Sequence, residues 1–272
     1  MLKTISKYLI IFIIFANTVV NSNAQETIFG GINIGVKAGG SLLITEFSTD
    51  LSQSINEFDN KSGLSVAVEL SKYLSDHWEI ALEINQVVLN GENYSPSFSA
   101  DGYHAVFMNP LTGPVEYNNT LLGQKIVFGY FIKSLCKHEG SFNINPFIRA
   151  GVGLQTYKSK FKYIDAADDI IIFGKGENNN YTDLSTAVYT FGTGFKTNLS
   201  PKFYLITSFT LNLVSYDFLD VVHNYDNTGN RLNLSGVYTD INVGIFYTIT
   251  NYKPGKGRNK KSSIREYLPF GK

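Results

Sequence analysis

The chain contains little sulfur, and this removes several classes of site. Cys136 is the only cysteine among 272 residues, so no disulfide can form within the chain and no thiolate cluster can hold a metal. It does not follow an N-terminal apolar segment directly, so we do not expect a lipid anchor there. We interpret it as a small residue in a turn, and the alternative is an intermolecular disulfide or a reactive thiol.

Recognisable catalytic patterns are also missing. The sequence has no HExxH, no P-loop, no pair of cysteines and no calcium-binding loop. Its histidines are far apart, and none has a serine nucleophile turn beside it: His77, His104, His138 and His223. The sequence therefore predicts no catalytic residues, no cofactor and no resident metal.

An excess of charge of either sign is absent as well. The 23 lysine and arginine residues balance 23 aspartate and glutamate residues, which argues against a nucleic-acid partner. Asp165, Asp168 and Asp169 stand close together and could collect a cation, although solvated loop charge is the interpretation that we favour.

The first 24 residues are typical of a signal peptide. Lys3 and Lys7 precede an apolar run over residues 8–16, and Ala24 offers a small residue for cleavage before Gln25. An uncleaved anchor helix is the alternative. After this segment there is no run of about 18 apolar residues, so the rest of the chain could cross a membrane only as strands.

Alternation with a period of two is the main positive signal. Tyrosine (17) and phenylalanine (20) are abundant, and apolar and polar residues alternate in eight segments of strand length. The fourth segment is weaker because its second face also carries Val127 and Phe131. The predicted strands are about 31–43, 62–73, 78–85, 121–133, 142–157, 185–197, 203–213 and 237–249.

The connectors between these segments alternate in length. Those at about 71–77, 134–141 and 198–202 are short, whereas the others are long: about 44–62, 90–120, 158–184 and 214–236. Outer-membrane barrels combine short periplasmic turns with long extracellular loops. The sequence therefore predicts an all-β, eight-stranded antiparallel up-and-down transmembrane barrel over residues 25–252, in the outer membrane of a Gram-negative cell. A soluble periplasmic barrel is the structural alternative.

Residues 253–272 lack periodicity and are rich in lysine, so we expect a flexible, basic periplasmic tail. The alternative for this tail is an electrostatic contact with anionic lipid or with a cell-wall polymer.

The polar faces of the strands define a candidate lumen network. Eight strands leave an interior that side chains just fill, so charges pointing inward must pair. Four cations and four anions fall on these faces: Lys37, Lys125, Arg149 and Lys196, with Glu69, Glu79, Glu83 and Asp240. We expect them to plug the lumen, and a narrow gated pore or a site for a small polar solute is the alternative.

Short motifs carry a family resemblance. The segments Gly35–Gly39, Tyr73–Trp78 and Pro146–Gly153 resemble the PorT-like outer-membrane β-barrel proteins common in Bacteroidetes. The resemblance implies an eight-stranded barrel similar to the OmpA transmembrane domain, and a link to protein secretion for some members. It brings no catalytic residues.

These observations favour a non-enzymatic barrel with a structural or binding role. Its expected partners are outer-membrane lipid and, through the long loops, extracellular or secretion-system proteins. A small transporter and an outer-membrane lipid-modifying enzyme are the alternatives.

Overall fold

The structure is a computed structural model. It describes residues 31–48, 54–55, 58–75, 77–94, 113–132, 144–164, 171–174, 185–200, 202–215, 219 and 234–249. Within these ranges no helix is long and apolar enough to span a bilayer. Several predictions fall outside them: the signal peptide 1–24, the tail 253–272, Cys136 and the aspartates 165, 168 and 169.

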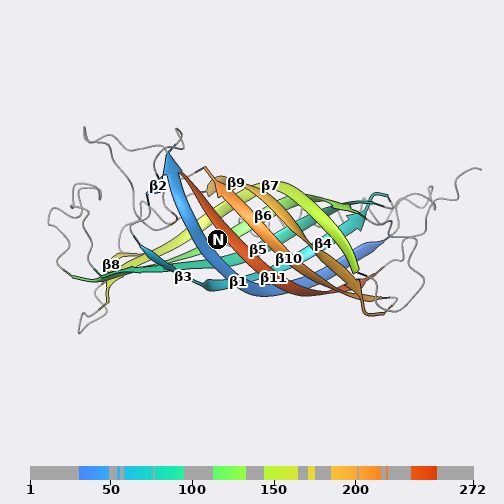
Figure 1. Ribbon diagram of the computed structural model, residues 1–272, viewed down its shortest axis with the longest axis horizontal. Helices are drawn as coiled ribbons and strands as arrows, with labels where there is room; N and C mark the ends of the chain where they lie inside the picture. The colour runs from blue at the N-terminus through green and yellow to red at the C-terminus, as the bar shows by residue number, and fades with distance from the viewer. Residues whose placement is uncertain are drawn as a thin grey trace, which may run out of the picture.

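Eight long antiparallel strands form a closed barrel (Figure 1). Each strand pairs with the long strand before it in the chain, and β1 closes the barrel by pairing with β11: Val36 lies between Val68 of β4 and Ile245 of β11. The predicted fold class is thus confirmed. The strands are β1 (Ile32–Ser48), β4 (Gly63–Tyr73), β5 (Trp78–Asn93), β6 (Val115–Phe131), β7 (Ile144–Tyr163), β9 (Ser185–Asn198), β10 (Phe203–Val214) and β11 (Leu234–Thr248).

Alternating burial explains why these segments are strands. Successive side chains of a strand point to opposite faces of the sheet, so apolar residues at every second position share one face. That face is the outer wall: Val36 is 60% exposed and Val68 is 52% exposed, whereas the neighbouring Lys37 and Glu69 are buried inside. The barrel is therefore apolar outside and polar at its centre.

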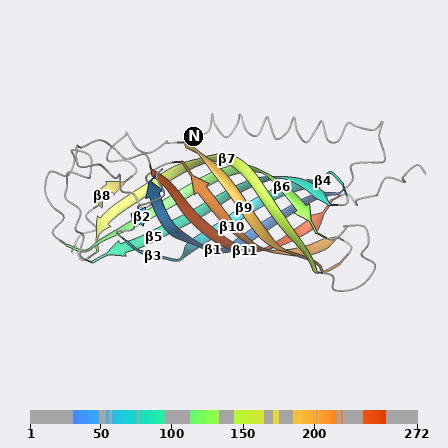
Figure 2. The same ribbon diagram turned by 45° about the horizontal axis from the view of Figure 1, so that its top comes forward.

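The two ends of the barrel differ. At the turn end, β4 joins β5 and β9 joins β10 through short turns in which Leu74 and Leu199 donate backbone hydrogen bonds to Trp78 and Phe203. At the opposite end, which we call the loop end, three short strands extend the sheet: β2 (Ser54–Ile55), β3 (Asp59–Lys61) and β8 (Ile171–Gly174). Both views place β2, β3 and β8 at this end (Figures 1 and 2).

The strands run further at the loop end than the sequence indicated. The predicted connectors 90–120 and 158–184 are wrong at their borders, because β5 continues to Asn93, β6 begins at Val115 and β7 continues to Tyr163. The connector 44–62 likewise contains the end of β1 together with β2 and β3. In the extensions of β5, β6 and β7 the outward residues are polar, so the outward apolar residues that marked these strands stop before the strands do.

The lumen is filled in three layers. The turn-end cluster is apolar and aromatic: Tyr73, Phe131, Phe147, Tyr204, Ile206 and Phe246. The charged layer lies in the middle. The loop-end cluster is apolar again and includes Leu121, Tyr157 and Tyr238, with Phe58 and Leu219 reaching in from outside the long strands. Along β6, for example, Phe131, Lys125 and Leu121 belong to the three layers in turn.

Candidate functional site

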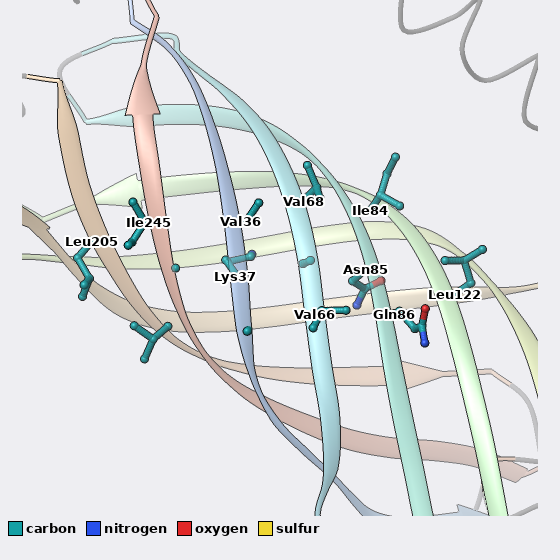
Figure 3. A pocket seen from close by; sticks show the side chains of 14 residues that line it. Val36, Lys37, Val66, Val68, Ile84, Asn85, Gln86, Leu122, Leu205 and Ile245 are labelled. Atoms are coloured by element: carbon teal, nitrogen blue, oxygen red, sulfur yellow. The ribbon is translucent and has the colours of Figure 1, made fainter.

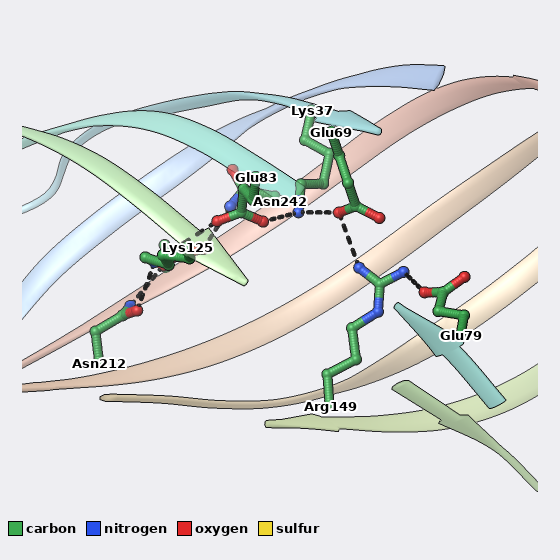
Figure 4. Close-up of polar contacts among 9 residues, drawn as sticks. Lys37, Glu69, Glu79, Glu83, Lys125, Arg149, Asn212 and Asn242 are labelled. Atoms are coloured by element: carbon green, nitrogen blue, oxygen red, sulfur yellow. Dashed lines mark hydrogen bonds and ion pairs between the residues drawn. The ribbon is translucent and has the colours of Figure 1, made fainter. Parts of the chain in front are cut away.

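The charged layer is the candidate site. All eight charged residues predicted to point inward are buried or nearly buried in the barrel, and they come from seven strands. Lys37 lies on β1, Glu69 on β4, Glu79 and Glu83 on β5, Lys125 on β6, Arg149 on β7, Lys196 on β9 and Asp240 on β11. Figure 4 shows most of them meeting across the lumen.

Arg149 joins two glutamates that lie on different strands. Its Nη1 is 2.9 Å from Oε2 of Glu69, and its Nη2 forms an ion pair with Oε1 of Glu79. The guanidinium carbon lies 4.8 Å from the centroid of the Phe147 ring, a cation–π distance. Arg149 thus connects the charged layer to the turn-end cluster.

Lys37 continues the chain of charges from Glu69. Its Nζ is 2.8 Å from Oε2 of Glu69 and also forms an ion pair with Glu83. The other oxygen of Glu83 lies 3.6 Å from Nζ of Lys125. Anions and cations therefore alternate along one connected chain, in the order Glu79, Arg149, Glu69, Lys37, Glu83 and Lys125.

Asp240 reaches this chain through an amide. The Lys125 ammonium donates a hydrogen bond to Oδ1 of Asn212 at 2.8 Å, and Nδ2 of Asn212 donates to Asp240 at 2.8 Å. Asn242 donates a second hydrogen bond to the same carboxylate. The sequence placed Asn212 and Asn242 on the inward face but did not mark them as part of the network, because an amide carries no charge to balance.

Lys196 departs from the predicted pairing. Within the described part of the chain no carboxylate lies within ion-pair distance of it, and its ammonium contacts the Tyr73 hydroxyl instead. Its Nζ lies 4.0 Å from the Tyr204 ring centroid and 4.7 Å from that of Tyr73. Aromatic faces attract a cation, so the turn-end cluster supplies part of the electrostatic stabilisation that a carboxylate would give the Lys196 ammonium.

The sequence analysis did not recognise this aromatic layer. Its residues lie on the inward face, which was expected to be polar. The sequence feature that could have revealed the layer is the mixed polarity of the fourth predicted strand. Phe131, which made that face mixed, lies 5.7 Å from Phe147 and 6.1 Å from Tyr73, centroid to centroid.

The chain has the fold of known barrels but little of their sequence. No family model and no curated protein matches it. Among solved structures, Neisserial surface protein A is 12% identical, with a TM-score of 0.39 and coverage of 79% of this chain and 96% of that one. The outer-membrane protein OprG of Pseudomonas aeruginosa is 10% identical (TM-score 0.39; 83% and 99%). The N-terminal β-barrel domain of OprF from the same species is 11% identical (TM-score 0.36; 80% and 98%).

At sequence identities of 10–12%, these similarities assign no role to any residue. The barrel itself follows from the pairing of β1 with β11, and the site must be interpreted from its own contacts.

A shallow hollow of about 620 Å³ lies on the outer wall (Figure 3). Side chains that line it include Val36, Val68, Ile84, Leu205 and Ile245. Val36, Ile84 and Ile245 are 60%, 47% and 54% exposed, so the hollow belongs to the apolar outer surface. Its lining suits hydrocarbon chains better than a polar solute.

The contacts of the candidate site are structural in kind. In the connected chain, each glutamate faces at least one cation, so none stands alone beside a group that it could deprotonate. Among the described residues no group of three or more histidine, cysteine, aspartate or glutamate side chains could hold a metal ion.

The polar side chains of the turn between β4 and β5 hold that turn together. His77 donates from Nδ1 to the Phe131 carbonyl at 2.7 Å, and the Ser75 hydroxyl accepts backbone hydrogen bonds from His77 and Trp78.

Proposed function

We propose that this chain is an outer-membrane β-barrel without a catalytic site, closed in its lumen, that binds partners at the loop end. The observation that carries the proposal is a continuous apolar belt on the outer wall. The loop end then faces the outside of the cell and the turn end faces the periplasm.

The belt has the height that an outer membrane requires. Its outward apolar residues run from Trp78 to Val88 on β5, from Ile132 to Leu122 around β6, and from Ile144 to Leu154 on β7. Each run is about ten residues, which at about 3.3 Å per residue and a tilt of about 40° spans roughly 25 Å. Gln86 and Gln124 are polar exceptions within these runs, and neither carries a charge.

Aromatic rings gather at the turn end of the belt. Trp78 lies 5.0 Å from Tyr130, and Phe203 lies 5.2 Å from Tyr247, centroid to centroid. All four rings are on the outward face. Amphipathic rings favour the boundary between hydrocarbon and water, and transmembrane barrels carry such girdles.

The filled lumen favours a closed barrel over a pore. A conducting path would have to pass the turn-end cluster and the loop-end cluster, and Phe131, Phe147 and Phe246 are all at most 1% exposed. We therefore expect no discrete conductance steps when the purified chain is inserted into planar lipid bilayers. Reproducible single-channel steps would instead support the alternative of a small gated pore.

We assign the binding role to the loop end because of its position in the barrel. The outer wall is apolar and the lumen is filled, so the loop end, where β5, β6 and β7 extend beyond the belt and pair with β3 and β8, is the surface left for a soluble partner outside the cell. Loops on a rigid scaffold commonly carry recognition. The PorT-like resemblance adds the finer proposal that the partner belongs to a protein-secretion system.

Deletion of residues 95–112 and 175–184 tests the proposal. The deletion variant should still sediment with membranes after alkaline extraction and keep a heat-modifiable mobility on gels, because it keeps every described residue of the belt and the lumen. It should lose the surface or secretion phenotype of the full chain. Extraction of the full chain without detergent would contradict the membrane assignment, and an unchanged phenotype would contradict the binding role.

A further inference from the structure

Three lysines follow one another on the outer face of β7. Lys158, Lys160 and Lys162 occupy alternate positions, and the residues between them face inward: Tyr157 is 1% exposed and Ser159 is 6% exposed. Lys158 is exposed to solvent, and the other two are partly exposed. The sequence analysis assigned these positions to a loop and gave them no role.

These lysines begin directly above the apolar belt. Leu154 is the last apolar outward residue of β7, and Thr156 separates it from Lys158. Four residues of a tilted strand raise Lys158 by about 10 Å above Leu154. The polar headgroup zone is roughly 5–8 Å thick on each side of the hydrocarbon, and a lysine side chain can bend back toward it. The first two ammonium groups therefore reach the depth of lipid headgroups.

Two acidic side chains on the neighbouring strands, among the residues that the structure describes, are already engaged. Glu116 lies 3.0 Å from Lys162, and Glu92 pairs with Lys61 and accepts a hydrogen bond from the Tyr94 hydroxyl at 2.8 Å. The Lys61 ammonium and the Tyr94 hydroxyl both hold the pKa of Glu92 below its usual value, which keeps this carboxylate charged and occupied.

Lys158 and Lys160 have neutral neighbours instead. Their cross-strand partners on β6 are Thr120 and Asn118, which carry no negative charge. Nδ2 of Asn118 donates one hydrogen bond to Asn90 at 2.6 Å and keeps a second N–H to donate, and the Thr120 hydroxyl is another donor. Within the described part of the chain neither lysine forms an ion pair. The result is an outward patch of two cations and two neutral donors at headgroup depth, which we call the lysine patch: Thr120, Asn118, Lys158 and Lys160.

We propose that the lysine patch binds the phosphate groups of lipid A in the outer leaflet. The inference rests on the proposed function, which turns this end of the barrel toward that leaflet. Lysine ammonium groups bind phosphate as compact point charges, and hydroxyl and amide donors complete the coordination of its oxygens. The adjoining apolar belt would pack against the acyl chains of the same lipid. Lipid A thereby meets both halves of the surface at once.

Titration of the full-length chain with lipid A in detergent micelles tests this proposal, with the shift of the thermal unfolding midpoint as the readout. Each lysine near an anionic lipid surface contributes roughly a factor of five, so K158Q/K160Q should bind lipid A about 25-fold more weakly. K61Q is the matched control, because it removes a lysine at the same end that Glu92 already neutralises, and it should bind as the unaltered chain does. K158R/K160R keeps both charges and should retain the affinity.

Two further titrations identify the source of the phosphate. Dephosphorylated lipid A should lose the lysine-dependent part of the binding, and inorganic phosphate alone should give no comparable shift. Equal binding by K158Q/K160Q and the unaltered chain would overturn the proposal, as would an equal shift with inorganic phosphate. If the chain sediments with membranes but the glutamine variant binds normally, the lysine patch is wrong and the membrane assignment stands. If the chain does not sediment with membranes, the proposed function itself fails.

Discussion

Replacing Arg149 by methionine should lower the free energy of unfolding by about 3–5 kcal/mol, the usual cost of removing one partner from a buried ion pair. Within the described residues Arg149 provides the only ion pair of Glu79 and one of the two of Glu69. Methionine keeps most of the apolar stem, so the loss reports on charge more than on volume. Urea unfolding in lipid vesicles, followed by fluorescence, measures it, because Trp78 is the only tryptophan in the chain.

Two further variants separate charge from packing at this position. The double variant R149M/E79Q removes the stranded carboxylate together with its partner and should recover part of the lost stability. R149K keeps the charge but loses the planar guanidinium that reaches two glutamates. Its free energy of unfolding should therefore lie between those of R149M and the unaltered chain. A loss of less than roughly 1 kcal/mol in R149M would mean that the pair behaves like an exposed one, and the buried network would then not stabilise the barrel.

The part of the fold that carries the apolar belt was predictable because its outer wall follows a simple rule. Every second residue of a strand must be apolar where the wall meets hydrocarbon, and this rule gave the faces of all eight long strands. Strand ends at the turn end were placed within a few residues, as in β4 and β10, because turn residues mark them. Where the strands leave the belt, as at Glu116 on β6, the outward residues are polar and the inward ones, such as Val115 and Tyr117, are apolar and buried, so an outer wall of apolar residues no longer marks the strand.

The residues of the candidate site could be predicted, but not their contacts. The alternation along each strand is enough to place Glu69 and Arg149 on the inward face. These two residues lie 80 positions apart in the chain, however, and they meet across the lumen. Their meeting depends on the tilt and stagger of the closed barrel, which no local pattern contains. Glu83 and Lys125 differ, because they are direct cross-strand partners on β5 and β6.

The layers of the lumen also could not be predicted from the alternation of apolar and polar residues. The rule assumed that an inward face is polar, but a barrel this narrow has a solid interior that must be packed like any other protein core. Charges are favourable there only when paired, so a central layer of charges between two apolar layers keeps each ion close to its partners and away from the ends. Tyr73 and Phe131 therefore face inward for packing, and they supply the surface on which Lys196 rests.

Replacing Ile148 by arginine should lower the free energy of unfolding by about 2–4 kcal/mol in lipid vesicles, because the side chain lies on the outer wall near the middle of the belt run Ile144–Leu154. Thr156 is the matched control, since it follows Ile148 on the same face of β7 just beyond the last belt residue. T156R should cost only about 0–1 kcal/mol, the range found near the bilayer interface.

The difference between I148R and T156R matters more than either value. Both positions lie on the outer face of one strand, so in water an arginine at either would be tolerated to a similar degree. Only a hydrocarbon environment makes the cost depend on depth. Equal effects in the two variants would contradict the apolar belt as a membrane surface and favour a soluble barrel, whereas a gap of about 2 kcal/mol or more would place Ile148 in lipid.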